Sequence, residues 1–327
     1  MGRLLKSALE FNNNWIDKKE NVEVNQKLSI VIPVYYPKYL KEVLEHLSKL
    51  EGIYEVITVF DYVEKDLNQY IDDYNYNFII VSHDKNYNAS SARNTGSIYA
   101  NGDLILFLDK DMILSPNYIL KAKELLKVNN DQGVILGFRD NVDYKEVPDF
   151  NNWHDADIIN DWRINTLVND SFLDLTLLSC GSSDNNLNKN NILKIYEQSN
   201  KFRKLGINKK NTIGFWDLPC MVISHSLTIP REYFFEIGGY PEWTVGWGAE
   251  DIALGFLAVA KHLPIIPIEV GSYHIRHEPY SGSEKQKWLE MRRNLQKYKK
   301  WASNLDEYPS INASKCIERS KVYYKSK

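Results

Sequence analysis

The sequence predicts an α/β protein built on an open sheet with buried parallel strands. Apolar, β-branched runs at residues 28–34 and 54–60 enclose a segment of helical periodicity, as in a strand–helix–strand unit. A third apolar run, LILFLDKDM at residues 104–112, ends abruptly in two aspartates around a lysine. Because ligands of open α/β sheets bind at the carboxyl ends of the strands, Asp109 and Asp111 are expected beside a metal and a phosphorylated ligand.

Length and composition exclude several classes of protein. A chain of 327 residues with 43% hydrophobic content can bury a sizeable core, so disorder throughout is excluded. With 40 Lys and Arg against 43 Asp and Glu, the net charge of -3 gives no reason to expect nucleic acid as a partner. The three cysteines are far apart and show no CxxC spacing, which indicates a reducing compartment without a disulfide framework or zinc site.

The sequence predicts a cytoplasmic protein. No segment approaches the roughly 18 uninterrupted apolar residues of a membrane helix. Residues 1–9 are too short and too charged for a signal peptide. They fit either a frayed terminus, which is the simpler interpretation, or an amphipathic turn at a membrane surface, which would make the protein peripheral to a membrane.

The chain is expected to comprise an N-terminal extension, one catalytic domain and a C-terminal helical extension, at residues 1–27, 28–280 and 281–327. The domain would have a nucleotide-binding half and an acceptor-binding half, at 28–140 and 141–280. Periodicity predicts further helices at 40–47, 116–128, 252–260 and 284–301, and further strands at 77–82, 133–138, 220–229 and 265–270. Residues 144–218 are expected to form short helices and loops over the active edge. From residue 302 the periodicity fades, which indicates a loosely held tail.

The segment NYNASSARNTG, at residues 86–96, leads into a short helix that carries Arg93. Its small residues let the backbone approach a ligand, and an arginine can form a forked contact with phosphate. A polar segment that caps the helix, with Arg93 exposed to solvent, fits the same sequence equally well. Asp61 follows the second strand directly, so it is expected at the same sheet edge as Tyr35 and Asp109.

A second notable stretch, WGAED, places Glu250 and Asp251 in the first turn of a predicted helix. Acidic residues are common there because they complement the helix dipole. The preceding GYPEWTVGWG would present both carboxylates beside an aromatic wall. Helix dipole and solvent access are expected to keep Asp251 ionised, as a general base requires.

The last predicted strand runs into two histidines, His274 and His277. Such a pair in a loop is usually solvated. If the backbone between them turns, they and Asp111 form a carboxylate and imidazole site suited to Mn²⁺. That interpretation depends on three distant segments meeting.

Together, LSIVIPVYYP, SARNTG, LFLDKD and WGAED resemble a GT-A glycosyltransferase of the family 2 type, over about residues 28–277. The C-terminal part is similar to the inverting galactosyltransferase-type domain, through IGGY at 237–240, GWGAED at 246–251 and HIRH at 274–277. The resemblance implies a Rossmann-like mixed central sheet flanked by helices. It also implies a transferase that moves a hexose or N-acetylhexosamine from a UDP-sugar to a hydroxyl of a glycan or glycoconjugate.

The resemblance assigns a role to each matching residue. Asp111, His277 and His274 would hold Mn²⁺ or Mg²⁺. Asp251 would be the catalytic base, with Glu250 beside it on a sugar or acceptor hydroxyl. The nucleotide-sugar would be bound by Pro33, Tyr35, Asp61, Arg93, Asp109, Lys110 and Trp247.

The chain departs from the family pattern at two places. Only one acid, Asp61, follows the second strand where the family usually has two, so uracil recognition stays open. Residues 222–225 read VISH where relatives often have paired glycines, so the choice of sugar stays open too. His225 is either a pocket residue or a strand histidine satisfied by backbone, and the second interpretation is preferred. Retaining relatives tend to carry Glu-Asn where this chain has Glu250-Asp251, which favours inversion.

Three other functions remain open: a non-catalytic nucleotide-sugar-binding module, a retaining transferase on the same fold, and a nucleotidyltransferase. The last lacks the glycine-rich loop expected near its first strand. In the helix at 284–301, Trp288, Met291, Leu295 and Tyr298 form a stripe that would pack on the domain. Its basic face is either solvated or able to bind an anionic lipid or acidic polymer. Residues 277–285 could order as a lid over metal and nucleotide.

Overall fold

The computed structural model describes residues 25–62, 66–168, 216, 218–278 and 282–326. Most of the predicted N-terminal extension, its proposed amphipathic turn, residues 169–215 of the long connection and the centre of the proposed lid therefore lie outside the described residues. Within them, no helix is long and apolar enough to cross a membrane.

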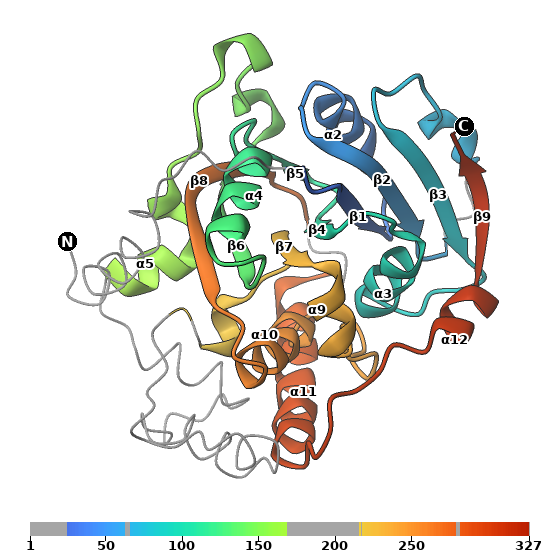
Figure 1. Cartoon of the computed structure of the whole chain (residues 1–327), viewed down its shortest axis with the longest axis vertical. Coiled ribbons are helices and arrows are strands. Elements are labelled where there is room, and N and C mark those ends of the chain that lie inside the picture. Colours follow the sequence, from blue (N-terminus) through green and yellow to red (C-terminus); the bar gives the residue numbers. More distant parts are fainter. Residues whose placement is uncertain (1–24, 63–65, 169–215, 217, 279–281, 327) are drawn as a thin grey trace.

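A mixed sheet of nine strands, in the order β5-β8-β6-β7-β4-β1-β2-β3-β9, forms the centre of the described chain (Figure 1). Parallel pairs join β1 to β2 and β4, β2 to β3, and β6 to β8, whereas β7, β5 and β9 pair antiparallel with their neighbours. The strands are β1 Leu28–Val34, β2 Ile53–Phe60, β3 Asn77–His83, β4 Leu104–Leu108, β5 Met112–Ile113, β6 Val134–Val142, β7 Ser226–Pro230, β8 Ile265–Ile275 and β9 Ser320–Lys325.

Helices cover both faces of this sheet (Figure 1). The α-helices are α2 Leu40–Leu47, α3 Ala89–Tyr99, α4 Tyr118–Val128, α5 Trp162–Val168, α9 Arg231–Glu236, α10 Glu250–Ala260, α11 Glu284–Ser303 and α12 Ala313–Glu318. Short 3₁₀ turns are η1 Leu67–Tyr70, η2 Tyr144–Glu146, η3 Phe150–Asn152, η4 Ile158–Asn160 and η6 Pro219–Met221. The mixed sheet flanked by helices confirms the predicted fold class.

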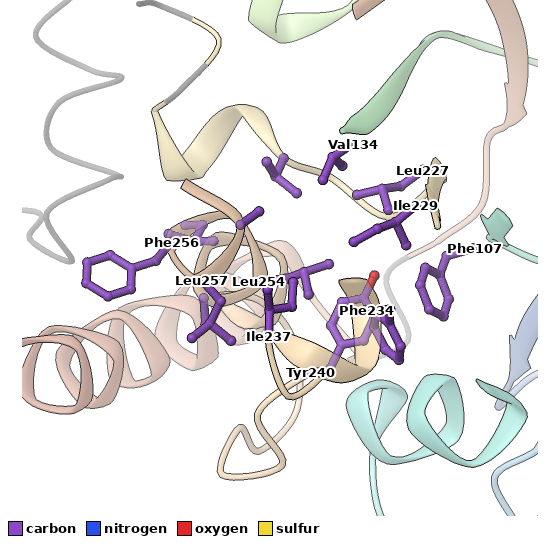
Figure 2. Packing of buried hydrophobic residues seen from close by; sticks show 14 of the residues in the cluster. Phe107, Val134, Leu227, Ile229, Phe234, Ile237, Tyr240, Leu254, Phe256 and Leu257 are labelled. Atoms are coloured by element: carbon purple, nitrogen blue, oxygen red, sulfur yellow. The ribbon is translucent and has the colours of Figure 1, made fainter. Parts of the chain in front are cut away.

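Alternate residues of the central strands enter two separate cores. In β4, Ile105 and Phe107 join the core under α3, α9, α10 and α11, while Leu106 joins the core under α2 and α4. Figure 2 shows Phe107 packed near Phe234 and Tyr240 in the first of these cores. Burial on both faces explains why these strands are continuous apolar runs instead of alternating ones.

A close approach of helix to sheet positions α3. A Cβ atom built on Gly96 would collide with the Val31 side chain of β1. A glycine there lets α3 lie directly on the parallel strands. The helix, with Arg93 on its first turns, is therefore held against β1 and β2.

Two predicted strands have different bounds in the structure. The run at 220–229 is strand only from Ser226, because η6 occupies Pro219–Met221. The last strand, β8, continues to Ile275, so His274 lies on the strand itself. The predicted short helices of the long connection are confirmed by η2, η3, η4 and α5 in the part that the structure describes.

The prediction of a loosely held tail is wrong. After α12, β9 pairs antiparallel with β3 and completes one edge of the sheet. Tyr324 packs on Phe78, and Arg319 and Cys316 are buried. The tail has no visible periodicity because α12 has only six residues and β9 is an edge strand with mostly exposed side chains.

Candidate active site

The two aspartates of LFLDKDM lie directly beyond β4. The backbone turns sharply there, since the Met112 amide donates to the Asp109 carbonyl at 3.1 Å. The Asp109 side chain is 30% exposed, whereas that of Asp111 is 5% exposed. The turn therefore leaves the Asp109 carboxylate partly exposed to solvent and buries the Asp111 carboxylate among protein side chains.

Asp111, His274 and His277 meet at this turn. The Asp111 carboxylate lies 2.9 Å from His277 Nε2 and 3.5 Å from His274 Nε2. The antiparallel pairing of β5 with β8 sets Met112 opposite His274 and so brings the segments together. Ligand atoms of the three residues all lie within 4.8 Å of one another. The convergence on which the metal interpretation depended is thus present in the structure.

The donor chemistry of this triad fits a divalent cation. Burial lowers the pKa of His274 to about 4, with a further contribution from the charge of Arg139, so the ring is neutral and able to coordinate. Its Nε2 faces the Asp111 carboxylate, and its Nδ1 is buried without a hydrogen-bond partner among the described residues. One carboxylate with two imidazoles suits Mn²⁺ and similar ions.

Asp111 is ionised despite its burial. Burial opposes the charge, but the hydrogen bond with His277 and the positive charge of Lys110 help to hold the pKa of Asp111 well below its usual range. Lys110 Nζ lies 2.7 Å from Asp111 Oδ2 and the lysine is 5% exposed. Lys110, which the resemblance places among nucleotide-sugar-binding residues, is thus a direct neighbour of the triad.

Arg93 connects this turn to the WGAED stretch. Its guanidinium lies 3.0 Å from Asp109, 3.6 Å from Glu250 and 3.9 Å from Asp251. Burial disfavours the charged guanidinium, but Tyr240 and the three carboxylates outweigh that effect and raise the pKa of Arg93. Since Arg93 is only 4% exposed, the alternative of a solvated arginine is wrong.

Glu250 and Asp251 open α10, as the sequence predicts. The Asp251 carboxylate accepts a hydrogen bond from Ser224, whose hydroxyl also contacts the Tyr240 hydroxyl. Burial raises the pKa of Asp251, although Arg93 and Ser224 oppose the shift. Solvent access was expected to keep Asp251 ionised, and this explanation is wrong. The side chain is only 23% exposed, and its negative charge is favoured by Arg93 and Ser224.

The pKa of Glu250 is also shifted. Burial and the neighbouring Asp251 charge raise the pKa of Glu250 to about 7, against the opposing effect of Arg93. Its Oε2 is buried without a hydrogen-bond partner in the described part of the chain. Glu250 can thus gain or lose a proton near neutral pH, and one of its carboxyl oxygens is left open to a hydroxyl group.

Trp247 lies on a loop that α11 holds in place. The Trp247 amide donates to Glu290 at 3.0 Å, and Asn294 donates to the Trp247 carbonyl at 3.1 Å. Trp247 is 41% exposed. Its ring centre lies 5.8 Å from that of Trp288, and the two rings meet edge to face. Lys287 Nζ lies 4.6 Å from the centre of the Trp247 ring, so this partly exposed indole, a few residues before the carboxylate pair, already has a cation over one face.

The residues predicted to bind the uracil ring lie at the ends of β1 and β2. Tyr35 is 43% exposed and Pro33 is partly buried. Asp61 is only 3% exposed and accepts hydrogen bonds from the Tyr87 and Asn88 amides at 2.9 and 2.8 Å. Asp61 therefore holds the segment that caps α3.

His225 is satisfied by side chains, so the backbone interpretation is wrong. Its Nδ1 lies 2.8 Å from Ser226 Oγ and its Nε2 lies 3.2 Å from an Arg163 nitrogen. Arg163 and Asp161 form a fully buried ion pair beside it at 2.9 Å. Packing of η4 and α5 against β6 creates this cluster, and weak periodicity across residues 144–218 gave no signal for it.

Sequence reasoning also missed a buried network behind the site. Arg319 of the tail forms two hydrogen bonds with Glu242, at 2.7 and 2.8 Å. Asn94, next to Arg93 on α3, donates to Glu242 and to the Tyr240 carbonyl at 3.2 and 2.8 Å. The only hint was the position of Glu242 between the IGGY and WGAED stretches.

The family model described as "Glycosyl transferase family 2" matches residues 29–210. No curated protein sequence matches the chain.

Similar solved structures share little sequence with the chain. S. aureus TarS in complex with UDP-GlcNAc is 17% identical over 77% of this chain, with a TM-score of 0.47, and the chain spans 59% of its length. A Pyrobaculum calidifontis mannosyltransferase with GDP-Man and Mn²⁺ is 13% identical over 85% of this chain and 68% of its own, with a TM-score of 0.47. GalNAc-T7 with UDP, GalNAc and Mn²⁺ is 15% identical over 79% of this chain and 44% of its own, with a TM-score of 0.50, which supports a shared fold. Because the family model covers more than half of the sequence, the chain belongs to glycosyl transferase family 2 and is a glycosyltransferase with the GT-A fold.

Proposed function

We propose that the protein is a metal-dependent, inverting glycosyltransferase that moves a hexose or N-acetylhexosamine from a UDP-sugar to a hydroxyl of a glycan or glycoconjugate. One observation carries the proposal. Buried Arg93 joins Asp109, beside the Asp111 triad, to the carboxylate pair at the start of α10. A metal-binding group and a candidate base thus belong to one connected site.

Asp111, His274 and His277 would hold the cation, and the UDP and Mn²⁺ of the GalNAc-T7 structure are consistent with this choice. A bound divalent cation stabilises the charge that develops on the diphosphate leaving group. Asp109, on the same turn, would contact the ribose. Pro33, Tyr35 and Asp61, at the ends of β1 and β2, would border the uracil ring of the nucleotide.

Asp251 would act as the base. In one displacement, the acceptor oxygen bonds to the anomeric carbon, the bond from that carbon to the diphosphate oxygen breaks, and the hydroxyl proton passes to Asp251. Its raised pKa makes it a stronger base than an exposed aspartate. Glu250, with an unpartnered buried oxygen, would orient a hydroxyl of sugar or acceptor. Trp247 would pack on a sugar ring.

A screen for slow hydrolysis of UDP-sugars, with and without Mn²⁺, tests this function before the acceptor is known. We expect one UDP-hexose or UDP-N-acetylhexosamine to be cleaved only with the cation, and the released sugar to carry the inverted anomeric configuration by NMR. Release with retained configuration would support the retaining alternative. UDP binding without turnover across donors and acceptors would support the non-catalytic module.

A further inference from the structure

Helix α11 turns a continuous cationic and apolar surface toward solvent. Taking about 100° per residue, most of its exposed residues gather within an arc of about 140° that contains no acid, and Glu284 and Lys297 are exposed on either side of this arc. We call this surface the α11 outer face, and it consists of Lys285, Trp288, Leu289, Arg292, Arg293, Gln296, Lys299 and Lys300. The helix lies at the bottom of the view in Figure 1, below α10.

Packing on the opposite side fixes which way this face points. Leu295, Tyr298 and Ala302 are buried in the core beneath α10. Asn294 donates to the Val245 and Trp247 carbonyls, both at 3.1 Å. The helix therefore cannot rotate about its axis without losing its core contacts, so the outer face is a lasting feature of the fold.

The outer face carries two large apolar side chains that the core does not use. Trp288 is 56% exposed and Leu289 is 44% exposed. Trp247, which is proposed to pack on a sugar ring, meets Trp288 edge to face, so the outer face adjoins the proposed active site without including it. Tryptophan and leucine among cations are typical of helices that lie in the headgroup region of a membrane.

The cations of the outer face are available to a partner. None of Lys285, Arg292, Arg293, Lys299 and Lys300 forms an ion pair with another described residue. The whole chain has a net charge of -3, so this cluster is a positive patch on a protein that is slightly negative overall. A soluble polyanion would need the cations alone, whereas the exposed Trp288 and Leu289 favour a partner with an apolar interior behind an anionic surface.

We propose that the α11 outer face docks on an anionic phospholipid membrane. Trp288 and Leu289 enter the headgroup region, and the cations lie against the lipid phosphates. The docking does not depend on the reaction that the active site performs, since none of the outer-face residues belongs to that site.

Co-sedimentation of the full chain with vesicles tests the proposal. We expect binding to vesicles of phosphatidylcholine mixed with phosphatidylglycerol, weakened by salt, and no binding to phosphatidylcholine alone. Arg292→Gln with Lys299→Gln should weaken the partition coefficient about 30-fold. The matched double change Lys145→Gln with Lys321→Gln, which removes two exposed cations elsewhere, should leave binding unchanged.

The apolar contribution needs its own pair of variants. Trp288→Ser with Leu289→Ser should weaken binding about tenfold. Leu120→Ser with Ile317→Ser, at exposed apolar positions on α4 and α12, should have no effect. Circular dichroism of each variant confirms that it is folded.

Two results would overturn the inference. One is failure of the full chain to bind the anionic vesicles at low salt. The other is equal binding of vesicles and soluble polyphosphate, with the Trp288 and Leu289 double variant unaffected, which would identify the outer face as a site for soluble polyanions.

Discussion

Arg93 shows how one buried charge can organise a catalytic site. Four groups that raise its pKa surround it, and three of them are carboxylates from two distant stretches of sequence. Without this cation, Glu250 and Asp251 would be two poorly solvated neighbouring carboxylates, an arrangement that favours protonation of one of them. The arginine therefore lets a base persist in a poorly solvated place.

Replacing Asp251 with asparagine tests the role of the base. Asp251→Asn keeps the hydrogen bond geometry with Ser224 approximately but cannot take a proton, so kcat should fall by roughly 10³-fold, within the usual range for general bases. UDP affinity, measured by calorimetry with Mn²⁺, should stay within about twofold, because Asp251 does not contact the triad. Full transfer activity in this variant would exclude Asp251 as the base.

Glu250 should make the stability of the protein depend on pH. Its pKa is about 7 in the folded protein and 4.5 in the reference state, so the folded state binds the proton more tightly and loses this advantage as the pH rises between these values. Glu250→Gln should therefore stabilise the protein at pH 8 by on the order of 2–3 kcal/mol and have little effect at pH 4. Urea unfolding at both values measures the difference, and an effect independent of pH would contradict the assignment.

At the scale of elements, the tail acts as a brace for the loop before α10. Strand β9 fixes Arg319 against the sheet edge, and Arg319 holds Glu242 at the start of that loop. Burial opposes the charge on Glu242, but the hydrogen bond and charge of Arg319 outweigh it and lower the pKa of Glu242 to about 2. The ion pair thus connects the last strand of the chain to the segment that carries Trp247.

Arg319→Met should destabilise the fold by roughly 3 kcal/mol, because it removes the buried cation of Glu242 and leaves this mostly buried carboxylate only the more exposed Lys315. The double variant Arg319→Met with Glu242→Gln should recover part of this loss, and a double-mutant cycle by thermal unfolding measures the coupling. Lys321→Met, an exposed position on β9, is the matched control and should be neutral. Additive effects of the two changes would show that the pair contributes nothing to stability.

The same elements show what the sequence could and could not predict. Strands β1, β2 and β4 are predictable because burial on both faces makes each a continuous apolar run. Strand β9 is not, because an edge strand with one exposed face resembles a polar tail. Motif spacing indicated that Asp109 and Asp251 share a site, but their meeting at Arg93 and the raised pKa of Glu250 depend on packing between segments more than a hundred residues apart, which a local pattern does not contain.

At the scale of the whole molecule, the proposed metal site joins the two halves of the catalytic domain. Asp111 follows β4 in the predicted nucleotide-binding half, whereas His274 and His277 come from the end of β8 in the other half. A cation held by all three would bind the folded chain and not the separated halves, so it should stabilise the entire fold. At a concentration 100 times the dissociation constant, one such site stabilises a protein by about 2.7 kcal/mol.

Mn²⁺ should therefore raise the melting temperature of the protein in a concentration-dependent way, and EDTA should reverse the rise. Asp111→Ala and His277→Ala should abolish the shift and weaken UDP binding at the same time, because the cation would link the triad to the diphosphate. His262→Ala, at an exposed histidine just after α10, is the matched control and should keep the full shift. Differential scanning calorimetry decides the matter: an unchanged Mn²⁺ response in Asp111→Ala would place the cation elsewhere and remove the triad from the proposed mechanism.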